Sequence, residues 1–269
     1  MANITQKGAT GPLSFQANGQ YQSGSTPGST PGAYGTSATY EVSQLVGTRW
    51  DLNDGREVIL VSMDSATTAT PGELYQDAAL VANHFDLAVT AFQAYSNNGD
   101  TPATVTVTLG GTAVTANEYQ GGYVDVVDGT QADGQGQFLR IASHPAQTST
   151  TGNVVITLEE APNTALTTSS KVSLVFPHGK NVIQNPTTPS NVPCGIALYP
   201  IAASNFGFLT SKGLCAALSD ATVASVGNEI SPSITTAGTV TLATATLANI
   251  GSAAYTAVSA KSYPVYLNL

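Results

Sequence analysis

The chain has 269 residues, of which 42% are hydrophobic and only 9% are charged, against a charged share of roughly 25% in ordinary soluble proteins. The 17 Asp and Glu residues outnumber the 8 Lys and Arg residues, which gives a formal net charge of −9. Nucleic-acid binding depends on Lys and Arg contacts to phosphates, so this balance argues against a nucleic-acid partner. No run approaches the ~18 apolar residues of a membrane span, and we expect neither a membrane segment nor a secretory signal.

The first 45 residues are predicted to form an extended N-terminal arm. Residues 8–40 contain no charged residue, and residues 24–32 repeat the turn-forming sequence Ser-Thr-Pro-Gly. Such a segment buries too little apolar surface to offset its own ordering entropy. It is either a linker with incidental aromatic residues or an arm that becomes ordered on a neighbouring subunit. In the second case the candidate interface residues are Phe15, Tyr21, Tyr34 and Tyr40.

Residues 46–184 are predicted to form a β-rich domain with one possible helix. The apolar run at 56–63 is typical of a buried strand, and the spacing of apolar residues over 73–94 predicts a helix. From residue 104 onward short alternating segments are separated by turn residues, as in an antiparallel sandwich or barrel. These predicted strands cover 104–109, 122–127, 138–141, 154–158 and 172–176.

Residues 185–193 contain three prolines in nine positions and are predicted to be a linker. The stretch 194–269 follows with only four charged residues and is predicted to form a second, small β domain. Its expected strands cover 196–201, 207–218, 239–243 and 264–269. The predicted fold class is therefore mainly β, with antiparallel sandwich or barrel domains, an N-terminal arm and at most one notable helix, at about 73–94.

The sequence carries no motif that predicts catalysis. A P-loop, a G-x-S-x-G elbow, an H-E-x-x-H pair and a C-x-x-C pair are all absent from it. The three histidines, His84, His144 and His178, are far apart in the sequence and are predicted to be ordinary packed or polar residues. We therefore expect a protein that is not an enzyme and that has no catalytic or cofactor-binding residues.

Two groups of residues could bind metal ions, although neither has a diagnostic spacing. Cys194 and Cys215 lack a neighbouring His pair, so a zinc site is not predicted, and they are either buried free thiols or a single bridge. Asp125, Asp128 and Asp133 lie in a glycine-rich segment that could supply oxygen ligands to Ca²⁺. Their spacing differs from that of an EF-hand, and a solvated, turn-forming loop is the favoured explanation. We predict no metal site.

The segment 194–213, CGIALYPIAASNFGFLTSKG, resembles a recurring pattern of tailed-phage capsid decoration (cement) proteins. In that pattern a glycine, a strand and a short turn precede an aromatic-Gly-aromatic triplet, a second strand and a glycine. Residues 227–238 and 263–269 are similar to the rest of that domain. Residues 119–130 and 138–145 resemble virion structural proteins of marine and cyanobacterial phages. The similar stretch spans 45–269 and consists of strand and turn patterns rather than chemical signatures.

The resemblance implies a β-rich virion protein, commonly trimeric, that binds where capsid subunits meet, and it transfers no catalytic residue. The expected function is to stabilise the shell from its outer surface, as a homotrimer bound to the major capsid protein, after assembly in the host cytoplasm. Residues 1 to about 190 exceed the minimal decoration domain, which leaves other positions on the particle open. The alternatives are a tail, baseplate or fibre-base component and a carbohydrate-binding adhesin domain.

Overall fold

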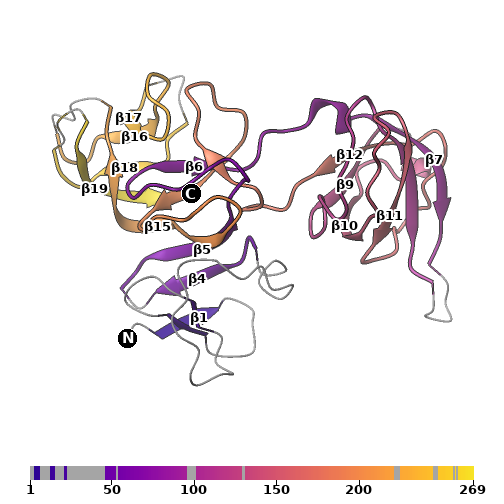
Figure 1. The fold of residues 1–269 in the computed structure, drawn as a ribbon, viewed down its shortest axis with the longest axis horizontal. Coiled ribbons are helices and arrows are strands. Elements are labelled where there is room, and N and C mark those ends of the chain that lie inside the picture. Colours follow the sequence, from indigo (N-terminus) through magenta and orange to yellow (C-terminus); the bar gives the residue numbers. More distant parts are fainter. Residues whose placement is uncertain are drawn as a thin grey trace. The chain divides into compact units, whose positions relative to one another are not determined.

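The computed structural model describes residues 46–52, 54–95, 101–128, 131–220, 225–244, 248–256, 258 and 260–269, and the backbone of strands at 3–6, 13–15 and 21–22 (Figure 1). The described residues are almost entirely β-strand and connecting loop, which confirms the predicted fold class. Their helical segments are two short 3₁₀ turns, η1 (Ala82–His84) and η2 (Gln131–Asp133). Neither turn is long enough to be a membrane-spanning helix.

The chain is divided into two compact units, one of which is inserted into the other. Unit 1 comprises Met1–Ala79 and His178–Leu269, and unit 2 comprises Leu80–Pro177. The chain therefore leaves unit 1 once, forms unit 2 and returns to unit 1. This division differs from the predicted boundaries at 184 and 194.

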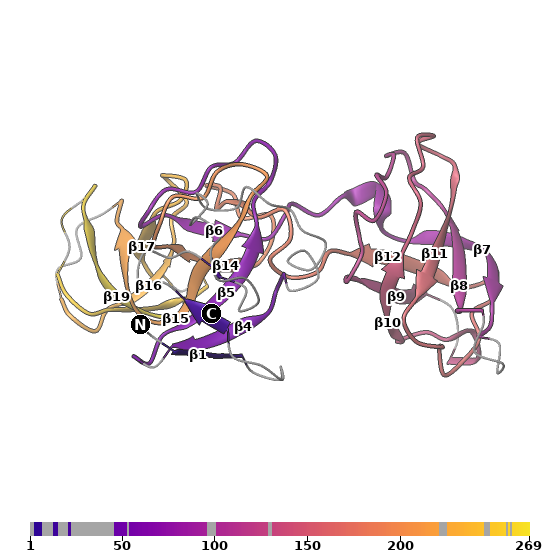
Figure 2. The ribbon, with the colours of Figure 1, turned by 60° about the horizontal axis from the view of Figure 1, so that its bottom comes forward.

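Unit 2 is a closed antiparallel barrel in which the strand order is β10-β11-β8-β7-β12-β9. Figure 2 shows β8 between β7 and β11, as this order requires. The barrel strands are β7 (Leu87–Gln93), β8 (Thr104–Thr108), β9 (Tyr123–Asp128), β10 (Phe138–Ser143), β11 (Asn153–Leu158) and β12 (Lys171–Val175).

Strict alternation of apolar and polar residues produces the barrel interior. In β8, Val105 and Val107 are fully buried, whereas the threonines on either side are half-buried. They lie opposite Ile156 and Val154 of β11, which are equally buried. Because successive side chains of a strand point to opposite faces, each strand contributes every second residue to one apolar core.

Unit 1 is built on one antiparallel sheet of thirteen described strands. Its longest path runs in the order β17-β16-β18-β19-β15-β5-β4-β1-β2-β3, while β14 pairs with β15 and β6 pairs with both β13 and β14. These strands are β1 (Asn3–Gln6), β2 (Leu13–Phe15), β3 (Tyr21–Gln22), β4 (Arg49–Leu52), β5 (Glu57–Ser62), β6 (Leu74–Gln76), β13 (Ile183–Gln184), β14 (Pro193–Ala197), β15 (Phe206–Leu218), β16 (Glu229–Pro232), β17 (Val240–Leu242), β18 (Gly251–Ala253) and β19 (Ser262–Asn268).

The long strand β15 joins the parts of unit 1. Its first half pairs with β5 and β14, and its second half pairs with β19 over seven positions (Figure 2). The β15–β5 pairing has a register shift between Thr210 and Lys212, and Lys212 pairs with both Glu57 of β5 and Asn268 of β19. Buried apolar residues pack on both halves, among them Leu209 in the first half and Cys215 in the second.

The predicted linker and C-terminal domain do not appear as separate bodies. Residues 185–192 connect β13 to β14, which begins at Pro193, and both of these strands pair with β6 inside unit 1. The strands of 194–269 likewise depend on the earlier chain, because six residues of β15 pair with β5. The strands on both sides of residues 185–192 pair with the same strand, β6. The proline-rich stretch is therefore a loop within one unit and not a linker between two domains.

The helix predicted over 73–94 is wrong. This stretch contains β6, the 3₁₀ turn η1 and β7, with Asp86 at a positive φ of 54° between the turn and β7. In β7, Leu87 and Val89 are buried and Ala88 is exposed, which is the period of a strand. Pairing of β7 with β8 and β12 satisfies its backbone, and this tertiary pairing overrides a coincidental helical spacing.

The described part of the predicted N-terminal arm forms short strands at the edge of the unit 1 sheet. β1 pairs with β4 and with β2, and β2 pairs with β3. In this register Phe15 lies opposite Tyr21 along the backbone. Tyr34 and Tyr40 lie outside the described residues.

Candidate functional site

Three side chains of unit 1 that are far apart in the sequence converge at the end of β6. Asp77 directly follows this strand, which is flanked by β13 and β14. β14 pairs with β6 through Pro193 and Gly195, and the register shift between them leaves Cys194 as the extra residue. A bulge of this kind re-aims a side chain, and here the Cys194 thiol reaches the Asp77 carboxylate.

His178 is the third member of this group and the first residue of unit 1 after the barrel. Gly179 follows at a φ of 82°, and a Cβ atom built on it would lie 3.1 Å from the Leu60 carbonyl oxygen. The packing at Gly47 is closer still, because a Cβ atom built on this residue would lie 2.5 Å from the His178 carbonyl oxygen. Two glycines thus allow the returning chain to pack closely against β5 and the segment that precedes β4, and so fix the position of His178.

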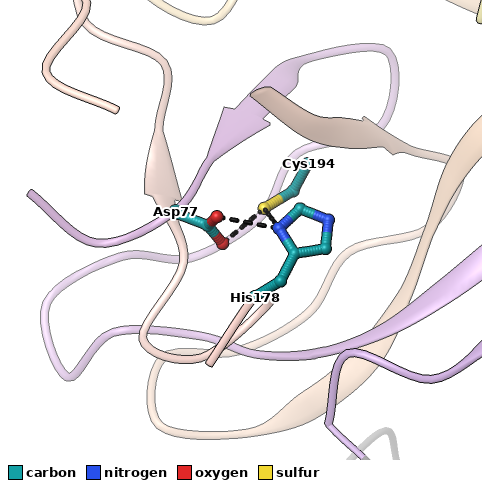
Figure 3. Close-up of side chains that lie close together, drawn as sticks. All are labelled: Asp77, His178 and Cys194. Atoms are coloured by element: carbon teal, nitrogen blue, oxygen red, sulfur yellow. Dashed lines mark hydrogen bonds and ion pairs between the residues drawn. The ribbon is translucent and has the colours of Figure 1, made fainter. Parts of the chain in front are cut away.

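Figure 3 shows how the three side chains of the cluster face one another. His178 Nδ1 lies 2.8 Å from Asp77 Oδ2, and the Cys194 thiol donates to Asp77 Oδ1 at 2.9 Å. The Gly179 amide donates to the same Oδ1 at 2.7 Å. Cys194 Sγ and His178 Nδ1 are 3.9 Å apart. We call these residues, Asp77, His178 and Cys194, the Asp–His–Cys cluster.

Burial and hydrogen bonding act in opposite directions on Asp77. Burial alone would raise the pKa of its carboxyl, but the hydrogen bond and charge of His178, with the Cys194 and Gly179 hydrogen bonds, place the pKa below its ordinary value. For Cys194, burial raises the pKa of the thiol well above its ordinary value, and the adjacent Asp77 charge raises it further. The carboxylate is therefore the charged partner and the thiol stays protonated.

The geometry of the Asp–His–Cys cluster does not suit nucleophilic catalysis. A cysteine nucleophile needs a histidine nitrogen that accepts its proton, with the carboxylate on the opposite nitrogen. Here Asp77 and Cys194 both face Nδ1 of His178, and the thiol donates to the carboxylate instead of to the ring. A thiol with a raised pKa is also a poor source of thiolate.

The cluster instead connects the segment that leaves unit 1 for the barrel to the segment that returns from it. The Asp77 side chain binds His178 and Gly179 on the returning segment. Its backbone amide donates to the Val192 carbonyl at 3.0 Å, and the Asn191 side chain donates to the Ala78 carbonyl at 2.7 Å. The exit and return of the inserted barrel are thus joined by hydrogen bonds within unit 1.

Among the residues that the structure describes, these three side chains form a group that could bind a metal ion. One oxygen, one nitrogen and one sulfur atom lie within 4.8 Å of one another. Sequence reasoning missed this group because Asp77 is 101 positions from His178 and 117 positions from Cys194 along the chain. The bulge that directs Cys194 inward depends on strand register, which the sequence does not reveal.

The other two histidines lie buried in the barrel, as predicted for packed residues. His84 Nδ1 is 2.6 Å from the Tyr119 hydroxyl, and its Nε2 is 3.0 Å from the Thr112 carbonyl oxygen. His144 Nε2 accepts the Tyr119 amide at 3.0 Å, and its Nδ1 lies 3.0 Å from the Pro145 carbonyl oxygen. Both rings are thus held by polar contacts around one buried tyrosine.

The remaining candidate ligands do not come together. Cys194 and Cys215 are both buried free thiols, so they do not form a bridge. Within the part of the chain that the structure describes, Asp125, Asp128 and Asp133 do not form a metal-binding group. Asp133 instead accepts a hydrogen bond from the Thr167 hydroxyl at 2.8 Å. A comparison with protein-family models, curated proteins and solved structures gives no match for this chain.

Proposed function

We propose that this chain is a non-enzymatic structural subunit of a phage particle that binds the outer capsid surface and stabilises the shell. In this proposal it acts as a homotrimer at junctions between subunits of the major capsid protein. The resemblance of residues 194–213 to capsid decoration proteins motivates the proposal. One surface feature of unit 1 carries it further.

That feature is the outer face of the β15–β19 strand pair. Leu214 and Tyr266 are opposite each other in the register, and their side chains are 46% and 55% exposed. Neighbouring exposed positions on the same two strands are Ala216, Pro264 and Asn268, and the charge on this face is that of Lys212 at its end. We call this set, Lys212, Leu214, Ala216, Pro264, Tyr266 and Asn268, the β15–β19 outer face.

A neutral, partly apolar sheet face of this kind suits association with another protein surface. Exposed aromatic and aliphatic side chains that are neighbours on a strand pair gain free energy when they leave water together. Aromatic residues such as tyrosine are enriched where interfaces carry most of their binding energy. The near absence of charge also means that few ions lose hydration when such a face is covered.

The stabilising effect follows from mass action. A subunit that binds the assembled shell and not the free capsid protein shifts the equilibrium toward the shell. If three copies are joined, their second and third contacts become effectively intramolecular, so weak single contacts add up to firm attachment. This route to function needs no catalytic residue.

The test combines copy number with a change on the β15–β19 outer face. Quantitative mass spectrometry of purified particles is expected to place the protein among the abundant virion components, and light scattering of the free protein to give a trimer. The Tyr266→Asp change should abolish binding to capsids that lack the protein, because it places an unpaired charge in the contact. Val155→Asp, at a similarly exposed strand position of the barrel, is the matched control.

Two results would contradict the proposal. A few copies per particle would indicate a tail or baseplate component instead of a capsid one. Full capsid binding by the folded Tyr266→Asp variant would show that the β15–β19 outer face is not the contact.

A further inference from the structure

We propose that the Asp–His–Cys cluster binds a thiophilic divalent cation, with Zn²⁺ as the best-matched ion. The ligand atoms are Asp77 Oδ2, His178 Nδ1 and Cys194 Sγ. The inference stands apart from the proposed function, since it rests on the contacts of these three residues alone.

The orientation of His178 is the first argument. Its Nδ1 atom faces both the carboxylate oxygen, at 2.8 Å, and the sulfur, at 3.9 Å (Figure 3). Tetrahedral zinc, with Zn–S near 2.3 Å and Zn–N near 2.0–2.1 Å, places a sulfur and a nitrogen ligand roughly 3.6 Å apart. The observed separation of 3.9 Å is close to this value. The oxygen and nitrogen atoms would move apart by about half an ångström to reach a tetrahedral separation.

Charge is the second argument. A thiolate, a carboxylate and a neutral imidazole together carry two negative charges, which a divalent cation neutralises. Binding displaces the two protons that now point at the Asp77 carboxylate. The Cys194 thiol proton and the Nδ1 proton of His178 are both released to solvent, and the metal-bound His178 ring is neutral, with its remaining proton on Nε2. No oxidant or reductant is needed, because the step exchanges protons for a metal ion.

The identity and support of the ligands favour zinc over harder ions. Sulfur and imidazole ligands suit Zn²⁺, whereas Ca²⁺ and Mg²⁺ take oxygen ligands. The Gly179 amide holds Asp77 Oδ1 at 2.7 Å, which orients the carboxylate and leaves Oδ2 for the ion. The His178 side chain is 36% exposed, whereas its Nε2 atom is buried and has no hydrogen-bond partner among the described residues. Three protein ligands leave the fourth position of a tetrahedral zinc site to an exogenous ligand such as water.

The ligands come from the end of β6, from the segment that returns from the barrel and from the bulge in β14. A bound ion would therefore join three separate segments of unit 1 by coordinate bonds at the point where the inserted unit is attached. Because such a site is absent from the unfolded chain, binding is expected to raise the unfolding temperature of unit 1.

The test uses the full chain after removal of metal with a chelator. Competition with a chromophoric chelator is expected to give one Zn²⁺ per chain, and Co²⁺ in its place to give sulfur-to-cobalt charge-transfer absorption in the near ultraviolet. Cys194→Ser and His178→Gln should each weaken Zn²⁺ binding by at least about tenfold. Cys215→Ser is the matched control, because it removes the other buried thiol and should leave both signals unchanged.

Each possible result decides the question. Absence of Zn²⁺ binding by the folded chain would overturn the proposal, as would equal binding by His178→Gln, whose half-exposed side chain makes it the safer variant for folding. If Cys194→Ser fails to fold, the charge-transfer band of Co²⁺ in the unchanged sequence and in Cys215→Ser still reports whether Cys194 is a ligand. Loss of that band in Cys215→Ser would assign the ion to another place.

Discussion

At the scale of single residues, Asp77 shows how a buried charge is accommodated in a chain with few cations. Its carboxylate is almost inaccessible to solvent and accepts from an imidazole, a thiol and a backbone amide. An ionised carboxylate without such donors would be strongly destabilising in the same place. The donors come from two segments, residues 178–179 and β14, so the hydrogen bonds that stabilise the charge also hold these segments against the end of β6.

We predict that Asp77 makes unit 1 sensitive to acid. Its pKa in the folded chain lies below the ordinary value of 3.8, so its contribution is complete above that value. As the pH falls below 3.8 the unfolded chain takes up the proton first, and the contribution is lost as the pH passes through the folded pKa. Asp77→Asn should lower the free energy of unfolding by about 2 kcal/mol at neutral pH.

The measurement is denaturant unfolding between about pH 7 and about pH 3, a range that reaches below the ordinary carboxyl pKa. The difference between the original chain and Asp77→Asn should shrink as the pH falls. Asp54→Asn is the control, since the Arg56 hydrogen bond also lowers the pKa of the Asp54 carboxyl, but this carboxyl is exposed. That change should alter stability by less than about 0.5 kcal/mol. A pH-independent difference for Asp77→Asn would contradict this account of the acid sensitivity.

At the scale of elements, close approach of the returning segment to the strand pair β4–β5 depends on backbone that only glycine tolerates. Gly179 has a φ of 82°, its carbonyl accepts from the Ser62 amide at 2.9 Å, and its amide donates to Asp77. Gly55, in the turn between β4 and β5, has nearly the same φ, 85°, but among the described residues other than its chain neighbours no heavy atom lies within 4 Å of the place that a Cβ would occupy there. Comparing substitutions at these two glycines therefore distinguishes the cost of backbone strain from the cost of steric crowding.

We predict that Gly179→Ala is more harmful than Gly55→Ala. Both changes force a Cβ into the left-handed region, at about 1 kcal/mol each. At Gly179 the added methyl also meets the Leu60 carbonyl oxygen at 3.1 Å, so a total loss of about 2–3 kcal/mol is expected. Denaturant unfolding of the two variants measures the difference directly. Equal losses would show that this packing is loose enough to move aside.

The individual strands could be predicted from the sequence far better than their partners. The alternation around Val105 and Val107 gives β8 and its buried face, because a period of two is a local property of the chain. The pairing of β15 with β5 joins residues about 150 positions apart, and no local pattern encodes it. The Asp–His–Cys cluster shares this difficulty, since it depends on the register of β14 against β6.

At the scale of the whole molecule, a closed barrel is inserted into a sheet-based unit through two closely joined chain crossings. The barrel has its own apolar core, and a closed barrel leaves no strand edge unpaired. Unit 1 has separate apolar clusters around β15. Each unit therefore contains the elements that an independent domain needs.

We predict that the two units fold separately. Replacing 80–177 with a short Gly/Ser linker should leave unit 1 folded, because Asp77 and His178 on either side of the insertion lie within hydrogen-bond distance. The fragment 80–177 should form the barrel alone. Circular dichroism and thermal unfolding of both fragments test this, with a cooperative transition expected for each. A fragment 80–177 that lacks a cooperative transition would show that the barrel needs unit 1.

The closeness of these crossings also has a mechanical consequence. The chain passes from one unit to the other next to Asp77 and His178, so tension carried by the chain between the units reaches unit 1 at these residues. The segment after β6 is hydrogen-bonded through Asp77 to His178 and to Cys194 of β14. A pulling force is therefore distributed over three segments and does not act on the end of β6 alone. The junction of the two units is thus reinforced where a pull would act on it.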